Sequence, residues 1–139
     1  MNTGEAIVLA KHVHHARPEL ERRFSFAQAV RAGGLLYISG CLSWDEQGAP
    51  LAVGDMSGQV AAVYADLERT LAAHGIGFDQ VLKETVYTTD MDRFVEAAGI
   101  RSEYLSGHSP PSATWLEVGR LVRPEFLLEV EMIALVPEE

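Results

Sequence analysis

The period of apolar residues changes along the chain, and each change marks a predicted secondary-structure element. Between Met56 and His74 apolar residues recur at i, i+3, i+4, i+7 and i+11, which predicts an amphipathic α-helix. Asp55 is placed to cap the first amides of this helix, and Gly75 to end it in a left-handed conformation. The apolar stripe consists of Val60, Val63, Tyr64, Leu67 and Leu71.

A strand and a second helix follow. Residues 79–89 alternate and are rich in β-branched side chains, which predicts a strand. Asp90 or Asp92 then caps a helix over about residues 93–105. The predicted buried side of this helix contains Phe94, Ala97, Ala98, Arg101, Tyr104 and Leu105.

The remaining predicted elements are strands. Residues 24–33 and 35–43 are separated by a glycine turn signal and predict a hairpin. Residues 5–23 suggest an edge strand followed by a loop, and two closing strands are predicted at 115–121 and 126–136. The order β-β-β-α-β-α-β-β predicts an α+β fold, with one mixed sheet and two helices on one face.

Both faces of the last predicted strand are largely apolar. Two helices can cover only one face of such a sheet, and a large apolar patch on a soluble monomer usually marks an association surface. We therefore expect a symmetric oligomer built through the uncovered face. One face takes Leu128, Val130, Met132 and Ala134, and the other takes Leu127, Glu129, Glu131, Ile133 and Leu135.

Composition and charge narrow the function classes. The chain has 139 residues, which is enough for a single domain over 1–139. Its net charge of −9 disfavours a nucleic-acid partner. No apolar run approaches the roughly 18 residues of a membrane span, so no membrane partner is expected. Cys41 is the only cysteine and excludes an internal disulfide, which is typical of a cytoplasmic protein.

Two carboxylates are candidates for chemistry. Glu129 and Glu131 lie two residues apart in a strand and point to the same face, where a carboxylate can orient or deprotonate a water molecule. The alternative is an ion pair across an oligomer interface, with Arg120 or Arg123 as partner. Cys41 is either a nucleophile or, as is commoner for a lone cysteine, a small buried hydrophobe.

Neither the histidines nor any nucleotide-binding motif indicates a further site. His12 and His14 share one side of a possible strand, but no third ligand stands at a known spacing, so we expect no metal. His108, beside two prolines, lies either at a pocket mouth or simply on a loop. The sequence contains no P-loop and no dinucleotide-binding glycine motif.

Three stretches in colinear order resemble the RidA (YjgF) family. "FSFAQAVRAGGLLYISGCLS" is similar to the family's P-Y-S-Q-A-V opening and its S-G-Q. "VLKETVYTTDMDRFVEAAGIRSEYL" resembles its strand, T-D-M/L-x-D-F and helix, and "SATWLEVGRLVRPEFLLEVEMIAL" resembles its closing strands. The resemblance covers residues 24–136. It implies a chorismate-mutase-like fold and a homotrimer with a central barrel of sheets. It also implies clefts between subunits that bind a small molecule.

The resemblance also implies an activity, the hydrolysis of reactive enamines and imines to ketones and ammonia without metal or organic cofactor. In the family an arginine grips the substrate carboxylate in a bidentate fork. Backbone groups near the S-G dipeptide and a glutamate position water against the imine carbon. By position, the dipeptide is Ser39-Gly40 and the glutamate is Glu129.

The chain departs from the family pattern at four positions. The arginine falls at Ala113, or at Thr114 if the alignment shifts by one residue. Losing a charge-assisted fork costs about 2–4 kcal/mol of binding. Trp115, on the same face as Ala113, is expected to fill part of the vacated space. The other departures are Phe26 for the tyrosine, Cys41 for the glutamine after S-G, and Ala98 for the asparagine of the second helix.

We therefore expect a RidA-like hydrolase or deaminase acting on a larger or unsaturated enamine or imine, such as a 2-aminomuconate-like compound. The alternative is a trimer of the same fold that binds a small ligand without turnover. RNA cleavage agrees poorly with the charge of −9. Whether Arg93, Arg101 or a neighbouring subunit replaces the lost arginine is open. Glu129 is the expected catalytic residue, and Phe26, Ser39, Gly40, Cys41, Ala113, Thr114 and Trp115 are the expected substrate contacts.

Overall fold

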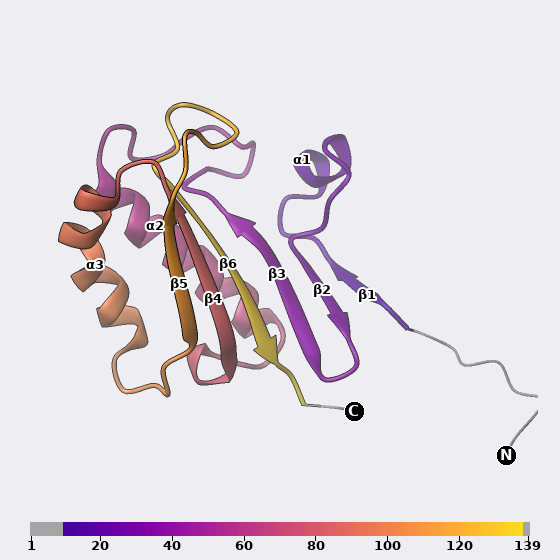
Figure 1. Cartoon of the computed structure of the whole chain (residues 1–139). Helices are drawn as coiled ribbons and strands as arrows, with labels where there is room; N and C mark the ends of the chain where they lie inside the picture. Colours follow the sequence, from indigo (N-terminus) through magenta and orange to yellow (C-terminus); the bar gives the residue numbers. More distant parts are fainter. Residues whose placement is uncertain (1–9, 138–139) are drawn as a thin grey trace, which may run out of the picture.

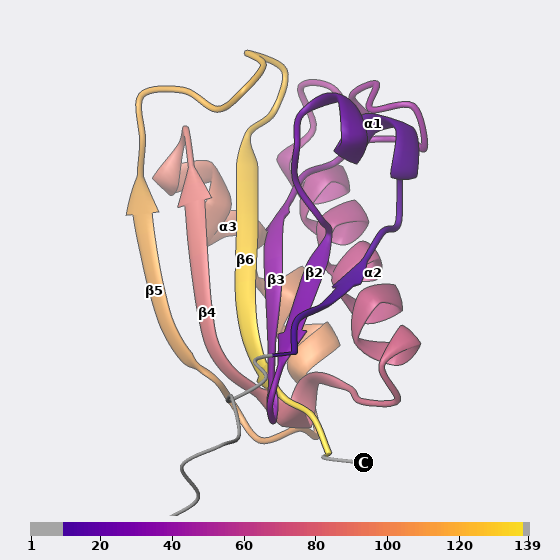
Figure 2. The same cartoon turned by 90° about the vertical axis from the view of Figure 1, so that its right-hand side faces the viewer.

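A computed structural model describes residues 10–137 and contains one six-stranded sheet in the order β1-β2-β3-β6-β4-β5. β5 runs parallel to β4, and the other neighbouring strands are antiparallel. The two long helices lie on the same side of the sheet, with β1 and β5 at its edges (Figures 1 and 2). The strands are β1 (His12–His14), β2 (Ala29–Ala32), β3 (Leu35–Cys41), β4 (Val81–Thr88), β5 (Ser112–Glu117) and β6 (Leu128–Leu135). The helices are α1 (Pro18–Arg23), α2 (Met56–Ala73), the 3₁₀ turn η1 (Phe78–Gln80) and α3 (Met91–Leu105).

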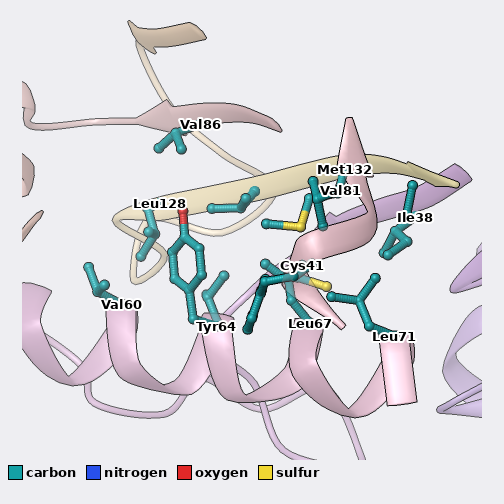
Figure 3. Packing of buried hydrophobic residues seen from close by; sticks show 14 of the residues in the cluster. Ile38, Cys41, Val60, Tyr64, Leu67, Leu71, Val81, Val86, Leu128 and Met132 are labelled. Atoms are coloured by element: carbon teal, nitrogen blue, oxygen red, sulfur yellow. The ribbon is translucent and has the colours of Figure 1, made fainter. Parts of the chain in front are cut away.

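Helix α2 confirms the helical stripe predicted from the sequence. All five stripe residues are fully buried, and they form the centre of the core between helix and sheet (Figure 3). The Asp55 carboxylate accepts a hydrogen bond of 3.0 Å from the amide of Gly58. Gly75 follows the helix with a φ of +72°. Both predicted ends of the helix are therefore confirmed.

Helix α3 begins at Asp90, one of the two predicted caps. The Asp90 carboxylate accepts a hydrogen bond of 3.1 Å from the amide of Arg93. Glu117, at the end of β5, accepts a second one, of 2.9 Å, from the amide of Met91. A carboxylate at a helix N-terminus satisfies free amides and complements the helix dipole. The start of α3 is therefore tied to the edge strand of the sheet.

The segment before β2 differs from its prediction. Part of the predicted loop forms the short helix α1, and the predicted strand 24–33 is reduced to β2. The amide of Phe26 donates to the Glu21 carbonyl and that of Ser25 to the Arg22 carbonyl, which is a Schellman motif. In this motif the residue after the C-cap is left-handed, and here it is Ser25, with a φ of 57°.

Strand β5 also differs from its prediction. It begins at Ser112, directly after the two prolines, and ends at Glu117, whereas the sequence predicted 115–121. Its pairing with β4 sets these limits, since Ser112 lies opposite Lys83 and Glu117 opposite Thr88. All six residues of β5 are exposed, so the strand forms an open edge.

The last strand confirms the predicted alternation. Its even-numbered residues are buried under the helices, and Glu129, Glu131, Ile133 and Leu135 lie on the opposite face, called here the open face. Leu127 is the exception: it precedes β6 and packs against the core. Large apolar side chains remain exposed on the open face, including Tyr37 at 46% and Leu135 at 51%. Within residues 10–137 no helix has the length and apolarity needed to cross a bilayer.

Replacing Ser25 by glycine should stabilise the protein by about 0.5–1 kcal/mol, because glycine adopts a positive φ without steric cost. Urea unfolding of Ser25→Gly against wild type measures this change. Ser102→Gly, an exposed position within α3, is the matched control and should lose about 0.5 kcal/mol. A loss of stability in Ser25→Gly would contradict the account of this turn.

Candidate functional site

A β-bulge organises the candidate site. Ile38 pairs with Met132, but the next paired residue of β3, Cys41, lies opposite Val130. Ser39 and Gly40 therefore lie together opposite Glu131, so β3 has one residue more than β6 over this stretch. Because side chains alternate with a period of two, the extra residue reverses the facing of everything that follows it.

The bulge brings Gly40 in front of Glu129. A Cβ atom on Gly40 would overlap the Glu129 carboxylate and would lie 2.6 Å from its Cδ atom. Only glycine leaves the space that this carboxylate occupies. The predicted pairing of Ser39-Gly40 with Glu129 is therefore found as a direct approach of backbone and side chain.

The Glu129 carboxylate is available for chemistry. Burial, followed by the neighbouring charge of Glu131, raises the pKa of Glu129 above its ordinary value. No residue between 10 and 137 donates a hydrogen bond to it. Glu131, by contrast, accepts one of 2.7 Å from the Tyr87 hydroxyl. A partly buried carboxylate of raised pKa is a better proton acceptor than an exposed one.

Phe26 lies beside this bulge. The Ser39 amide donates to the Gln28 carbonyl at 2.8 Å, and the Ser39 hydroxyl donates to the Ala27 carbonyl at 2.5 Å. These bonds hold the segment that carries Phe26 against the bulge. Phe26 is half-buried and lines a cavity of about 510 Å³ between α1, β1 and β2. The structure therefore brings Ser39, Gly40 and Glu129 together, and it ties Phe26 to them through Ala27, the next residue, whose carbonyl accepts the Ser39 hydrogen bond.

Cys41 does not share this region, which corrects its predicted place among the substrate contacts. It is 1% exposed and lies in the core with Leu67 and Leu71 (Figure 3). Burial raises the pKa of its thiol strongly, so the reactive thiolate is disfavoured. The Gln28 amide donates a hydrogen bond of 3.1 Å to its sulfur. The bulge accounts for the burial of Cys41, because without the extra residue its side chain would face the same way as that of Ser39.

Ala113 and Trp115 also lie apart from Glu129 within the chain. They pair with Glu84 and Val86, whose side chains are fully buried on the helix side of the sheet. Trp115 packs edge-on against Phe94 of α3, with ring centroids 5.0 Å apart. Within one chain Ala113 and Trp115 therefore do not share a pocket with Glu129, and their grouping in a cleft between subunits stays a prediction.

Thr114 points the other way and lies on the open face. Lys83 Nζ donates a hydrogen bond of 2.8 Å to its hydroxyl. Sequence reasoning missed Lys83 and the other polar residues of β4 on this face, Thr85 and Tyr87, although their odd-numbered alternation could have revealed them. A cavity of about 300 Å³ lies among Tyr37, Ser39, Lys83, Thr85, Glu131 and Ile133.

The arginines of α3 are already engaged, although Arg101 lies beside Ala113 and Trp115. Ala113 pairs with Glu84, and the Arg101 guanidinium lies 5.2 Å from the centroid of the Trp115 ring. Arg101 forms a fork with Glu84, with its Nε 3.0 Å from both carboxylate oxygens and its Nη2 2.7 Å from Oε1. Glu84 is fully buried and also accepts a hydrogen bond of 2.5 Å from the Tyr64 hydroxyl. Arg93 donates to the Gly54 carbonyl at 2.7 Å. Arg101 therefore lies on the face where the family's arginine is missing, but its guanidinium is already paired with Glu84.

The ion pairs of Glu129 and Glu131 with Arg120 or Arg123 were proposed across an oligomer interface and stay a prediction, and within residues 10–137 both arginines have other partners. Arg120 donates to the Leu121 carbonyl at 3.1 Å, and Arg123 pairs with Glu125 at 3.1 Å. Of the two alternatives for His108, the structure shows the loop, since the residue lies between α3 and β5, and its Nδ1 is 3.2 Å from Asp79 Oδ2. Among the described residues no group of three or more His, Cys, Asp or Glu side chains is arranged to hold a metal ion.

Comparisons of sequence and of structure with known proteins agree on one protein family. Residues 16–136 match the family described as Endoribonuclease L-PSP. A RutC family protein of Pyrococcus horikoshii is 34% identical over 109 residues, which is 78% of this chain and 85% of that protein. The RutC family protein YjgH of Escherichia coli is 32% identical over 124 residues, 88% and 92% of the two chains. The crystal structure of YyfA from Yersinia pestis, of the Rid protein family, matches 91% of this chain and 100% of its own, with 25% identity and a TM-score of 0.79.

Replacing Glu129 by glutamine should alter how stability depends on pH. A raised pKa means that, above the ordinary value of 4.5, the folded state binds more protons than the unfolded state. The free energy of unfolding then falls as the pH rises, and glutamine removes this fall. Thermal unfolding from about pH 4 to about pH 8 should show Glu129→Gln gaining on wild type as the pH rises. Glu96→Gln, exposed on α3, is the control. A pH-independent difference for Glu129→Gln would contradict the assignment.

Proposed function

Because the chain belongs to the RidA (YjgF) family, whose sequence profile is described as Endoribonuclease L-PSP, we propose that it hydrolyses a reactive enamine or imine. The observation that carries this proposal is the Glu129 carboxylate, which lies over Gly40 with no hydrogen-bond donor among the described residues. A carboxylate in this position can hold one water molecule by accepting a hydrogen bond from it, and can take its proton during the reaction. The open face beside it gives a small molecule access.

The reaction needs little more than this placement. The water oxygen bonds to the imine carbon while its proton passes to Glu129. Glu129 passes this proton to the nitrogen, which gives a carbinolamine. Glu129 then takes the hydroxyl proton and delivers it to the nitrogen as the carbon–nitrogen bond breaks, so that a ketone and ammonia leave. Holding water and imine together lowers the barrier, because the encounter is no longer between two free molecules. The raised pKa of Glu129 suits a group that both takes and returns a proton.

We also propose that the chain acts as a homotrimer with small-molecule clefts between its subunits. Exposed Tyr37 and Leu135 make the open face a candidate interface, and β5 offers an unpaired edge beside it. In such an assembly Ala113 and Trp115 of one subunit would share a cleft with Glu129 of the next. Trp115, 37% exposed, supplies a flat aromatic surface that suits an unsaturated, 2-aminomuconate-like substrate.

A second candidate function is ligand binding without turnover. It is favoured by the engagement of Arg93 and Arg101 away from the open face and by the absence of a cation at position 113. Cleavage of RNA, which the family description names, is disfavoured by the charge of −9.

Hydrolysis of 2-imino acids, generated in place by an amino-acid oxidase, separates these functions. We expect Glu129→Gln to slow the imine decay by at least about 100-fold, because the proton acceptor is lost. Ala113→Arg should raise activity on small 2-imino acids by about tenfold, by restoring a carboxylate fork.

Two controls accompany this assay. Sedimentation should give three times the chain mass of 15.2 kDa for wild type and for both variants. Activity in Ala113→Arg that survives the added Glu129→Gln change would contradict the assigned role of Glu129. If neither wild type nor Ala113→Arg is active, ligand binding without turnover becomes the better function.

A further inference from the structure

The cavity beside Phe26 carries an excess of positive charge in a chain of net charge −9. It measures about 510 Å³ and opens between α1 and the β1–β2 pair. Its basic residues are Lys11 and Arg22, with His15 beside them. Apolar side chains form much of the remaining wall, including Val13, Pro18, Phe26 and Val30.

The single acidic residue of this wall, Glu21, has its oxygens fully occupied. They accept hydrogen bonds from the amides of Ala16, Arg17 and Gln28, and His15 Nδ1 lies 2.8 Å from Oε1. Burial favours a higher pKa for Glu21, but the hydrogen bonds from Arg17, His15, Gln28 and Ala16 together lower it below its ordinary value. Glu21 therefore stabilises this segment through hydrogen bonds, and its oxygens are not free to bind a cation from solution.

Lys11 and Arg22 differ from almost all other basic residues of the chain. Of its eleven lysines and arginines, three have neither a hydrogen bond nor an ion pair through their side chains within residues 10–137, namely Lys11, Arg22 and Arg23, and Arg23 stacks on Phe24. Of these three, Lys11 and Arg22 line the cavity and Arg23 does not. The engaged ones are Arg17, Arg31, Arg69, Lys83, Arg93, Arg101, Arg120 and Arg123.

We propose that this cavity binds a small organic carboxylate, with Lys11 and Arg22 on its anionic group and Phe26 against its apolar body. A guanidinium and an ammonium around one carboxylate give charge-assisted hydrogen bonds, and the apolar wall favours a molecule with a hydrophobic body. The Schellman turn at Ser25 fixes Phe26 as the wall next to the Ser39 bulge. The ligand carboxylate is thus bound by Lys11 and Arg22 on the α1 side of the open face, and its binding requires no cation on β5.

This inference deepens the proposed function and rests on it in one respect, that the bound carboxylate is the substrate of Glu129. Phe26 and Ala27 connect the cavity to Ser39, and Ser39 adjoins Gly40 under Glu129. The substrate class is accordingly an apolar imine or enamine with a carboxylate at one end.

Equilibrium binding of phenylacetate, measured by calorimetry, tests the cavity without requiring turnover. Arg22→Gln and Lys11→Gln should each raise the Kd at least about fivefold, the usual effect of removing a charged hydrogen bond. Arg23→Gln is the matched control, since it removes the same charge from the next residue of the same helix, outside this cavity. It should change the Kd by less than about twofold. Phenylacetamide, of the same shape without the charge, should bind at least about fivefold more weakly than phenylacetate.

Three results would overturn the proposal: no binding of phenylacetate, equal binding of phenylacetamide, or equal losses in Arg22→Gln and Arg23→Gln. Glu129→Gln distinguishes this proposal from the proposed hydrolysis, because it should keep phenylacetate binding while losing imine turnover. Binding that depends on Arg22, in a protein that turns over no imine, would retain the carboxylate site and reject the hydrolase.

Discussion

The extra residue in β3 is the constraint on which the rest of the structure depends. With it, Cys41 completes the core under α2, and Gly40 leaves a space on the opposite face that the Glu129 carboxylate fills. Without it, the alternation would carry Cys41 to the open face and leave a gap in a closely packed interior. One local irregularity thereby serves both the stability of the core and the placement of the candidate catalytic group.

Much of the fold was predictable because it depends on period and on capping chemistry. The stripe of α2, the caps Asp55 and Asp90, and the alternation of β6 follow directly from side-chain spacing. Helix α1 was missed because six residues are too few to show a helical period, although a proline such as Pro18 suits the first turn of a helix. The listing of Cys41 among the substrate contacts was wrong because a bulge leaves no trace in an apolar run, whereas the alternative of a small buried hydrophobe is confirmed.

The site was predictable only in part, because facing depends on pairing with strands distant in sequence. Ser39, Gly40 and Glu129 meet as expected, whereas the parallel pairing of β5 with β4 turns Ala113 and Trp115 toward α3. Arg101 is a poor substitute for the missing arginine, because breaking a buried ion pair such as that with Glu84 costs about 3–5 kcal/mol. Lys11 and Arg22 carry no such cost, since neither has a described partner to lose.

The central claim is that imine hydrolysis depends on Glu129 being held over Gly40, and Gly40→Ala tests it most directly. The added methyl group meets the Glu129 side chain from Cγ to Oε2 and forces it to move, and thermal unfolding checks that the variant is folded before the assay. The measurement is the rate of imine decay, made in whichever of wild type and Ala113→Arg is active. The account predicts a fall of about 10–100-fold, because a displacement of about 1 Å at a reacting group has effects of that order. An unchanged rate in a folded Gly40→Ala protein would contradict it.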